Sequence, residues 1–173
     1  RERIKDPVRA GAELVRLLYD IPAANPDPEL PTIVSIGRVT ADGATNVVPD
    51  RTYMEGTMRT FDEAWRRRVK EMVHEAAAEV DARFGVATEV DINHGYPCVY
   101  NDEELTQRVA DATAGLFGED AVVSLGLRPT AEDFGYYTLE YPSVYYRLGV
   151  GGDGEYFENR AAGRIHTAAF RPD

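Results

Sequence analysis

Apolar side chains recur at helical spacing over two stretches of the chain. The longer stretch, from Asp62 to Phe84, has one apolar face made of Trp65, Val69, Met72, Val73, Ala76 and Val80. Asp62 is suited to cap its first turn, and Gly85 is suited to end its last turn. The shorter stretch, residues 6–21, begins with Asp6 and Pro7 and carries Val8, Ala12, Leu14, Val15, Leu17 and Leu18. Both stretches are therefore predicted to be amphipathic helices.

Strand alternation lies between these two helices. Residues 32–40 are rich in β-branched side chains, and the stretch 41–44 predicts a turn. In residues 53–59, one face carries Met54, Gly56 and Met58, and the other carries Tyr53, Glu55, Thr57 and Arg59. The two strands are predicted to form an antiparallel pair with Arg59 on its open face. Residues 86–93 alternate again and predict a third strand.

The predicted order is helix, strand, strand, helix, strand. One further strand in front would complete the βαββαβ layout of a ferredoxin-like fold, in which two helices cover one face of the sheet. The residues Gly95, Tyr96 and Pro97 break the pattern and predict a domain boundary. Residues 1–95 are therefore expected to form an α/β (α+β) domain that lacks its first strand.

Residues 96–173 predict a second mixed segment. Its expected elements are a helix from Asn101 or Asp102 to Phe117, a strand at 122–125, a helix at 131–139 and a buried strand at 143–150. The glycines that follow at 151, 152 and 154 do not have the spacing of a phosphate-binding loop.

Charge narrows the range of partners. The formal net charge is −11, from 30 acidic and 19 basic residues, and such a field repels a nucleic-acid backbone. No apolar run approaches the ~20 residues of a membrane span, and the charged N-terminus does not resemble a signal peptide. The single cysteine, Cys98, excludes an internal disulfide and fits a reducing compartment. We therefore expect a cytoplasmic protein that binds neither nucleic acid nor membranes.

Residue types that could carry chemistry are few. The histidines are His74, His94 and His166, and the sequence has no HExxH, CxxC or GxSxG motif. His74 is expected on a helix surface, His94 at the end of a strand, and Cys98 packed after a proline turn. A self-contained metal or nucleophile site is therefore not predicted from residue types alone.

Longer motifs are more specific. The chain contains Asn46–Asp50 (NVVPD), Glu55–Phe61 (EGTMRTF), Thr130–Phe134 (TAEDF), Tyr145–Val150 (YYRLGV) and Ile165–Phe170 (IHTAAF). In this order and spacing the motifs resemble the M20 metallopeptidase family. The similarity is greatest to its amidohydrolases that cleave N-acyl amino acids, such as hippurate hydrolase.

The resemblance implies roles for particular residues. His166 matches the last metal ligand of a two-metal site. Asn46 and Arg59 match lid residues that hold the carbonyl or carboxylate of the substrate, and Gly149 of the matching strand motif is grouped with the substrate-binding residues. The planar guanidinium of Arg59 suits a carboxylate, and the side-chain amide of Asn46 suits a developing oxyanion.

The resemblance also implies a division of the chain. Residues 1–95 would be a lid and dimerisation domain, and residues 96–173 the C-terminal part of a zinc-peptidase-like α/β domain. The family's other metal ligands, general base and lid histidine would precede this sequence, so the chain alone is expected to be inactive. The complete protein is expected to form a homodimer and bind two divalent ions, either zinc or manganese, with cobalt and nickel as alternatives. Glu132 and Asp133 match an acidic pair whose role stays open.

Other functions stay open at this level. A non-catalytic ferredoxin-like dimerisation or small-molecule-binding module would have the same layout, although it would not need His166 or Arg59. A dipeptidase or deacetylase of the same family would share every motif, because residues outside this chain recognise most of the acyl group. The sequence therefore predicts hydrolysis of an N-acyl amino acid or small peptide without choosing the acyl group or the metal.

Overall fold

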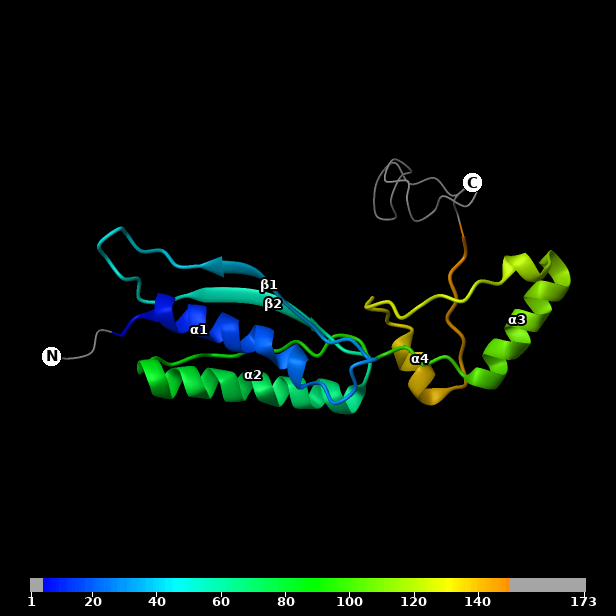
Figure 1. The fold of residues 1–173 in the computed structure, drawn as a ribbon, viewed down its shortest axis with the longest axis horizontal. Helices are drawn as coiled ribbons and strands as arrows, with labels where there is room; N and C mark the ends of the chain where they lie inside the picture. Colours follow the sequence, from blue (N-terminus) through cyan, green and yellow to red (C-terminus); the bar gives the residue numbers. More distant parts are fainter. Residues whose placement is uncertain (1–4, 150–173) are drawn as a thin grey trace.

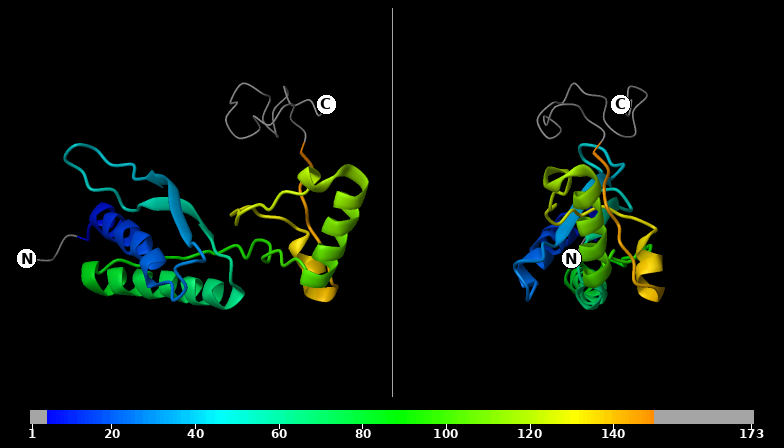
Figure 2. Two further views of the ribbon diagram at one scale, coloured as in Figure 1. Left: turned by 45° about the vertical axis from the view of Figure 1, so that its right-hand side comes forward. Right: turned by 90° about the vertical axis from the view of Figure 1, so that its right-hand side faces the viewer.

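A computed structural model describes residues 5–149 and places their elements in two groups along the molecule (Figure 1). The first group contains α1 (Pro7–Asp20), η1 (Ile21–Ala24), β1 (Ile33–Thr40), β2 (Tyr53–Arg59) and α2 (Glu63–Phe84). The second group contains α3 (Glu103–Phe117), η2 (Glu119–Ala121) and α4 (Gly135–Glu140). Figure 2 shows the hairpin of β1 and β2 on one side of α1 and α2, with the second group beyond one end of this unit.

Local sequence explains where the long helices begin and end. The Asp6 carboxylate accepts hydrogen bonds from two N–H groups in the first turn of α1, each at 3.0 Å. The Asp62 carboxylate accepts from the N–H of Trp65 at 2.6 Å. Gly85 ends α2 in the left-handed conformation with a φ of 69°, which glycine adopts without steric cost. The helices predicted at 6–21 and 62–84 are confirmed.

The core lies between α1, α2 and the hairpin. Val69 and Val80 of α2 are fully buried and belong to one apolar cluster with Leu14 and Leu18 of α1. Half-buried residues of the hairpin pack against this cluster: Val34, Ile36, Met54 and Met58. Complete burial of one side chain such as Val69 contributes about 1.5–3 kcal/mol, and each half-buried side chain of the hairpin contributes part of this amount. These contacts hold the sheet on the helices.

The buried face of α1 is rotated from the predicted one. Its buried positions are Ala10, Gly11, Leu14 and Leu18. Val8, which was predicted to face the core, is 44% exposed. A Cβ at Gly11 would come within 2.9 Å of Thr52 Cγ2, so the glycine allows the helix to approach the chain beside β2. Hydrophobic periodicity does not register such a contact, because glycine has no side chain.

The hairpin forms as predicted. β1 and β2 are antiparallel, with Ile33 opposite Arg59 at one end and Thr40 opposite Tyr53 at the other. The two methionines of β2 are half-buried, whereas Arg59 is exposed. The alternation therefore places Arg59 away from the helices.

The predicted strands at 86–93, 122–125 and 143–150 are wrong as far as the structure describes them. Within residues 5–149 the only sheet is the pair β1–β2. Residues 86–93 keep the predicted alternation of half-buried and exposed positions but form no ladder. In the third segment, Tyr146 is 71% exposed and Leu148 is 77% exposed, so the segment is not buried. A strand needs a neighbour for its N–H and C=O groups, and periodicity does not show whether one is present.

The helices of the second group begin at different kinds of residue. Of the two predicted caps, Asn101 and Asp102, it is Asp102 that caps α3, because its carboxylate accepts from the N–H of Leu105 at 2.8 Å. α4 begins at Gly135 rather than at Ala131, since the preceding residues form a turn in which the N–H of Gly135 binds the carbonyl of Glu132 at 3.2 Å. Among residues 5–149, no helix has the length and apolar content that crossing a membrane requires.

Candidate active site

Arg59 connects the hairpin with the second group of elements. It is the last residue of β2, and its Nη1 donates to the carbonyl of Pro129 at 2.8 Å. This contact uses one of the five N–H donors of a guanidinium, and the side chain is exposed. Arg59 therefore lies where a ligand between the two groups could reach it.

Asn46 lies at the opposite end of the hairpin. It is exposed in the turn between β1 and β2, where Ala44 and Val47 exchange backbone hydrogen bonds of 3.1 and 3.0 Å. The seven residues of β2 separate this turn from Arg59. At ~3.3 Å per residue β2 alone spans about 20 Å, and Asn46 lies beyond its far end, with residues 47–52 between. The structure therefore does not bring Asn46 and Arg59 together within one copy of the chain.

The predicted metal ligand, His166, lies outside the described residues. Within residues 5–149, no group of three or more His, Cys, Asp and Glu side chains could hold a metal ion. His94 Nδ1 lies 2.7 Å from Lys70 Nζ, so its ring already has a polar contact. Burial lowers the pKa of Lys70, and a nearby arginine adds to the effect. His74 is exposed on α2, as predicted. The described residues alone do not fit a metal centre.

A hydrogen bond and an ion pair from Arg147 hold the loop of residues 128–133, which contains the acidic pair Glu132 and Asp133. Arg147 Nη2 donates to Thr130 Oγ1 at 3.1 Å and lies 3.6 Å from a carboxylate oxygen of Glu132. Burial raises the pKa of Tyr145, and its hydrogen bond to Glu132 raises it further. α4 has no side-chain cap at its N-terminus. Glu132 therefore anchors the loop and does not cap a helix.

Sequence reasoning missed Arg147. It lies in the motif YYRLGV, which was interpreted as a buried strand, and a buried strand gave no reason to assign Arg147 a binding role. An arginine inside an otherwise apolar motif was the available signal. Gly149, two residues further on, is exposed, and no described atom beyond its chain neighbours lies within 4 Å of where a Cβ would stand. The described residues 5–149 therefore leave space beside this predicted substrate-binding residue.

Cys98 and Tyr100 lie in residues 85–102, the segment between α2 and α3, and their hydrogen bonds attach this segment to the start of α2. The N–H of Cys98 donates to Glu63 Oε1 at 2.9 Å, and its thiol donates to the Thr60 carbonyl at 3.4 Å. Burial, with the nearby Glu63 carboxylate, raises the pKa of Cys98 to about 11. Burial also raises the pKa of Tyr100 to about 12, and its hydroxyl donates to the Phe61 carbonyl at 3.0 Å. Cys98 is therefore a packed neutral thiol at pH 7 rather than a nucleophile.

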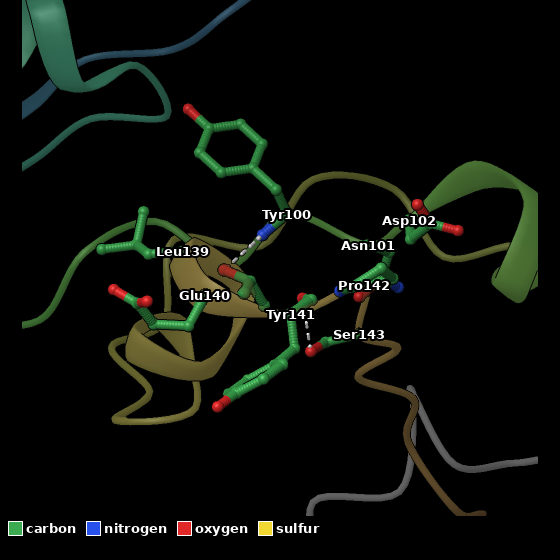
Figure 3. Close-up of a pocket in the computed structure, with 9 residues that line it drawn as sticks. Tyr100, Asn101, Asp102, Leu139, Glu140, Tyr141, Pro142 and Ser143 are labelled. Atoms are coloured by element: carbon green, nitrogen blue, oxygen red, sulfur yellow. Dashed lines mark hydrogen bonds between the residues drawn. The ribbon is translucent and has the colours of Figure 1, made fainter.

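An open cavity of about 350 Å³ lies between the start of α3 and the end of α4 (Figure 3). Several of its polar groups take part in local structure. Asp102 caps α3, the N–H of Tyr100 contacts Thr138 Oγ1 at 3.4 Å, and Ser143 Oγ donates to the Tyr141 carbonyl at 2.9 Å. Of the predicted site residues that the structure describes, neither Asn46 nor Arg59 nor Gly149 lines it, so the cavity adds no candidate to the active site.

Comparison with known sequences identifies the family. The sequence profile of peptidase family M20/M25/M40 matches residues 8–167. The chain belongs to this family. The match extends over both groups of elements and over the motifs from Asn46 to His166, so the resemblance in the motifs is confirmed.

Curated relatives of this M20-family chain include two deacetylases. N-acetyl-L-cysteine deacetylase of Bacillus subtilis is 30% identical over 151 residues, which are 87% of this chain and 36% of that protein. N-acetyldiaminopimelate deacetylase of Brevibacillus brevis is 30% identical over 148 residues, which are 86% of this chain and 39% of that protein. The chain therefore spans less than half the length of these relatives.

Solved structures share the fold of this M20-family chain. A dinuclear metal-binding peptidase of the M20 family from Bacillus subtilis has a TM-score of 0.65 at 31% identity, covering 79% of this chain and 35% of that chain. A protein from methicillin-resistant Staphylococcus aureus, assigned as an aminohydrolase, has a TM-score of 0.70 at 28% identity, covering 80% and 36%. The predicted mixed α/β fold class is confirmed.

Proposed function

We propose that the protein containing this chain is a metal-dependent amidohydrolase that cleaves the amide bond of N-acyl amino acids. The observation that carries the proposal is the family match over residues 8–167. The relatives named as deacetylases of N-acetyl-L-cysteine and N-acetyldiaminopimelate support this substrate class. In this proposal residues 1–95 supply the lid, and residues 96–173 supply the C-terminal part of the catalytic domain.

Arg59 binds the carboxylate of the substrate in this proposal. Its planar guanidinium can form two parallel hydrogen bonds with a carboxylate. The contact with Pro129 supports the assignment, since it holds the side chain between the hairpin and the second group of elements. The space that residues 5–149 leave beside Gly149 is consistent with a substrate lying against the YYRLGV motif.

Two divalent ions complete the proposed site, as in the dinuclear M20 peptidase. Residues 5–149 hold no three-ligand cluster, so His166 would be one ligand and other parts of the complete protein would supply the rest. When bound, such ions polarise a carbonyl and lower the pKa of a bound water. A mixed nitrogen and oxygen donor set suits zinc or manganese, with cobalt and nickel as alternatives.

We assign Asn46 to the active site of a second copy. β2 alone spans about 20 Å and Asn46 lies beyond its far end, so one small substrate does not reach both Asn46 and Arg59 of the same copy. A homodimer formed through the lid would let the hairpin turn of one copy reach the site of the other. There the amide of Asn46 would donate to the developing oxyanion, a contact whose loss costs about 3 kcal/mol.

The proposed location is the cytoplasm. Cys98 is a free thiol in the described structure, and free thiols are typical of reducing compartments. The net charge of −11 speaks against a nucleic-acid partner.

Amide hydrolysis by the complete protein tests the proposal. Hippurate and N-acetyl amino acids would be assayed with manganese or zinc, using the unmodified protein, His166→Ala and Arg59→Ala. We expect His166→Ala to lose both activity and bound metal. We expect Arg59→Ala to keep its metal while KM rises about 10- to 100-fold, because it loses hydrogen bonds to a charged group.

Two results would contradict this account. Full activity in both variants would show that His166 and Arg59 do not have these roles. An unmodified protein that hydrolyses none of the N-acyl amino acids would favour the alternative, a non-catalytic ferredoxin-like dimerisation or small-molecule-binding module.

A further inference from the structure

Two arginines from distant parts of the chain meet at the loop 128–133. Arg59 Nη1 donates to the carbonyl of Pro129 at 2.8 Å, and Arg147 Nη2 donates to Thr130 Oγ1 at 3.1 Å. Pro129 and Thr130 are neighbours in the chain, so their Cα atoms are about 3.8 Å apart. The nitrogen atoms Arg59 Nη1 and Arg147 Nη2 are therefore at most about 11 Å apart.

The charge around this loop differs from that of the whole chain. The chain carries a net charge of −11, whereas three arginines, Arg59, Arg128 and Arg147, surround or belong to the loop beside Glu132 and Asp133. These five side chains carry three positive and two negative charges, a sum of +1. An anion would meet attraction here that most of this acidic surface does not offer.

The ion pair of Arg147 leaves it able to bind another anion. Its Nη2 lies 3.6 Å from Glu132, and the two side chains are 37% and 29% exposed. A charge-assisted hydrogen bond between an arginine and a carboxylate is about 2.7–2.9 Å long. Glu132 therefore holds Arg147 in place through a long contact, and a better-placed carboxylate could form the shorter one.

We propose that Arg147 is a second carboxylate-binding residue beside Arg59, and that the enzyme prefers N-acyl amino acids whose side chain carries a carboxylate. This inference rests on the proposed function, in which Arg59 binds the α-carboxylate. The two carboxylates of an N-acyl glutamate lie a few ångströms apart, and each can approach a guanidinium to about 3 Å. One such substrate can therefore contact both arginines, whereas a neutral side chain gains nothing from Arg147.

N-acetyl-L-glutamate and N-acetyl-L-glutamine test this selectivity, because the two substrates have nearly the same shape and differ in charge. The complete protein would be compared with Arg147→Met, Arg147→Lys and the control Arg108→Met. Arg108 is an exposed arginine of α3, outside the loop 128–133. Bound metal would be measured for every variant.

We expect the unmodified enzyme to prefer the glutamate substrate in kcat/KM. In Arg147→Met this preference should fall about tenfold or more, since hydrogen bonds to a charged group are lost, while the glutamine value stays within about twofold. Arg147→Lys should keep part of the preference, because it retains the charge without the planar fork. Arg108→Met should behave like the unmodified enzyme.

Three results would overturn the second carboxylate site and leave the proposed function standing. They are an unmodified enzyme that hydrolyses both substrates without preference, an unchanged preference in Arg147→Met, and an equal loss of both activities in that variant. A complete protein with bound metal that hydrolyses no N-acyl amino acid would overturn the proposed function, and the inference with it.

Discussion

At the scale of single residues, burial lowers the reactivity of Cys98. Its pKa rises from an ordinary value of 9.0 to about 11, since the thiol is partly buried and lies near the Glu63 carboxylate. At pH 8 a thiol with a pKa of about 11 has about 100-fold less thiolate than a thiol with a pKa of 9.0. The thiolate is the reactive form of cysteine, so the folded protein should protect this residue.

We therefore expect iodoacetamide to modify Cys98 at pH 8 about 100 times more slowly in the folded protein than in the urea-unfolded protein. Mass spectrometry of the alkylated chain would give both rates, with no other cysteine in the chain to interfere. Because the folded pKa is the higher one, the stability linked to this proton is fully present below about pH 9 and is lost as the pH rises toward about 11. Equal rates of modification in the two states would contradict the burial of the thiol.

Caps and distant partners differ in how well the sequence predicts them. Asp62 was predicted as a cap and Asp102 as one of two candidate caps, because a cap contacts N–H groups only a few residues ahead. The contact between Arg59 and Pro129 spans 70 positions, and Arg147 meets Thr130 across a loop. No local pattern encodes such contacts, so the positions of Arg59 and Arg147 at the same loop became visible only in the structure.

Close packing of the two strands shapes the hairpin at the scale of elements. A Cβ at Gly56 would stand 2.6 Å from the carbonyl oxygen of Ser35 and 2.7 Å from Ile36 Cδ1. Gly37, on the opposite strand, lies where the register shifts between Ile36 and Arg38, and no described atom beyond its neighbours lies within 4 Å of its Cβ position. The two glycines therefore form a matched pair, one crowded and one open.

Gly56→Ala should lower the free energy of unfolding by about 1–3 kcal/mol, because the strands must move apart to accept the methyl group. Gly37→Ala should be neutral or slightly stabilising, since it reduces the freedom of the unfolded chain without a clash. Urea unfolding followed by circular dichroism would measure both. A similar change in the two variants would argue against the close approach at Gly56.

Helices and strands were predicted with different success for a physical reason. The hydrogen bonds of a helix lie within one segment, so periodicity and caps suffice for α1, α2 and α3. The bonds of a strand need a second segment. Residues 86–93 have the predicted alternation but no ladder in the described part of the chain, whereas β1 and β2 are close in sequence and joined by one turn.

At the scale of the whole molecule, the hairpin separates two proposed substrate-binding residues, Arg59 and Asn46. Arg59 contacts Pro129 at one end of β2, which spans about 20 Å, and Asn46 lies beyond the other end. A site that uses both residues must therefore be built from two copies. In such a dimer, Arg59 and His166 would act in one copy, and Asn46 would come from its partner.

Mixed dimers test this central claim directly. Asn46→Ala and His166→Ala would each be nearly inactive alone, because every site would lack either the amide or the metal ligand. After subunit exchange between these two variants, each mixed dimer would contain one complete site. Random pairing would restore about a quarter of the unmodified activity on N-acetyl amino acids.

The matched mixture of Arg59→Ala and His166→Ala should stay inactive at low substrate concentration, since both residues are needed in the same copy. Recovery in the first mixture alone is the predicted result. Equal behaviour of the two mixtures, with mixed dimers shown to form, would contradict the shared site.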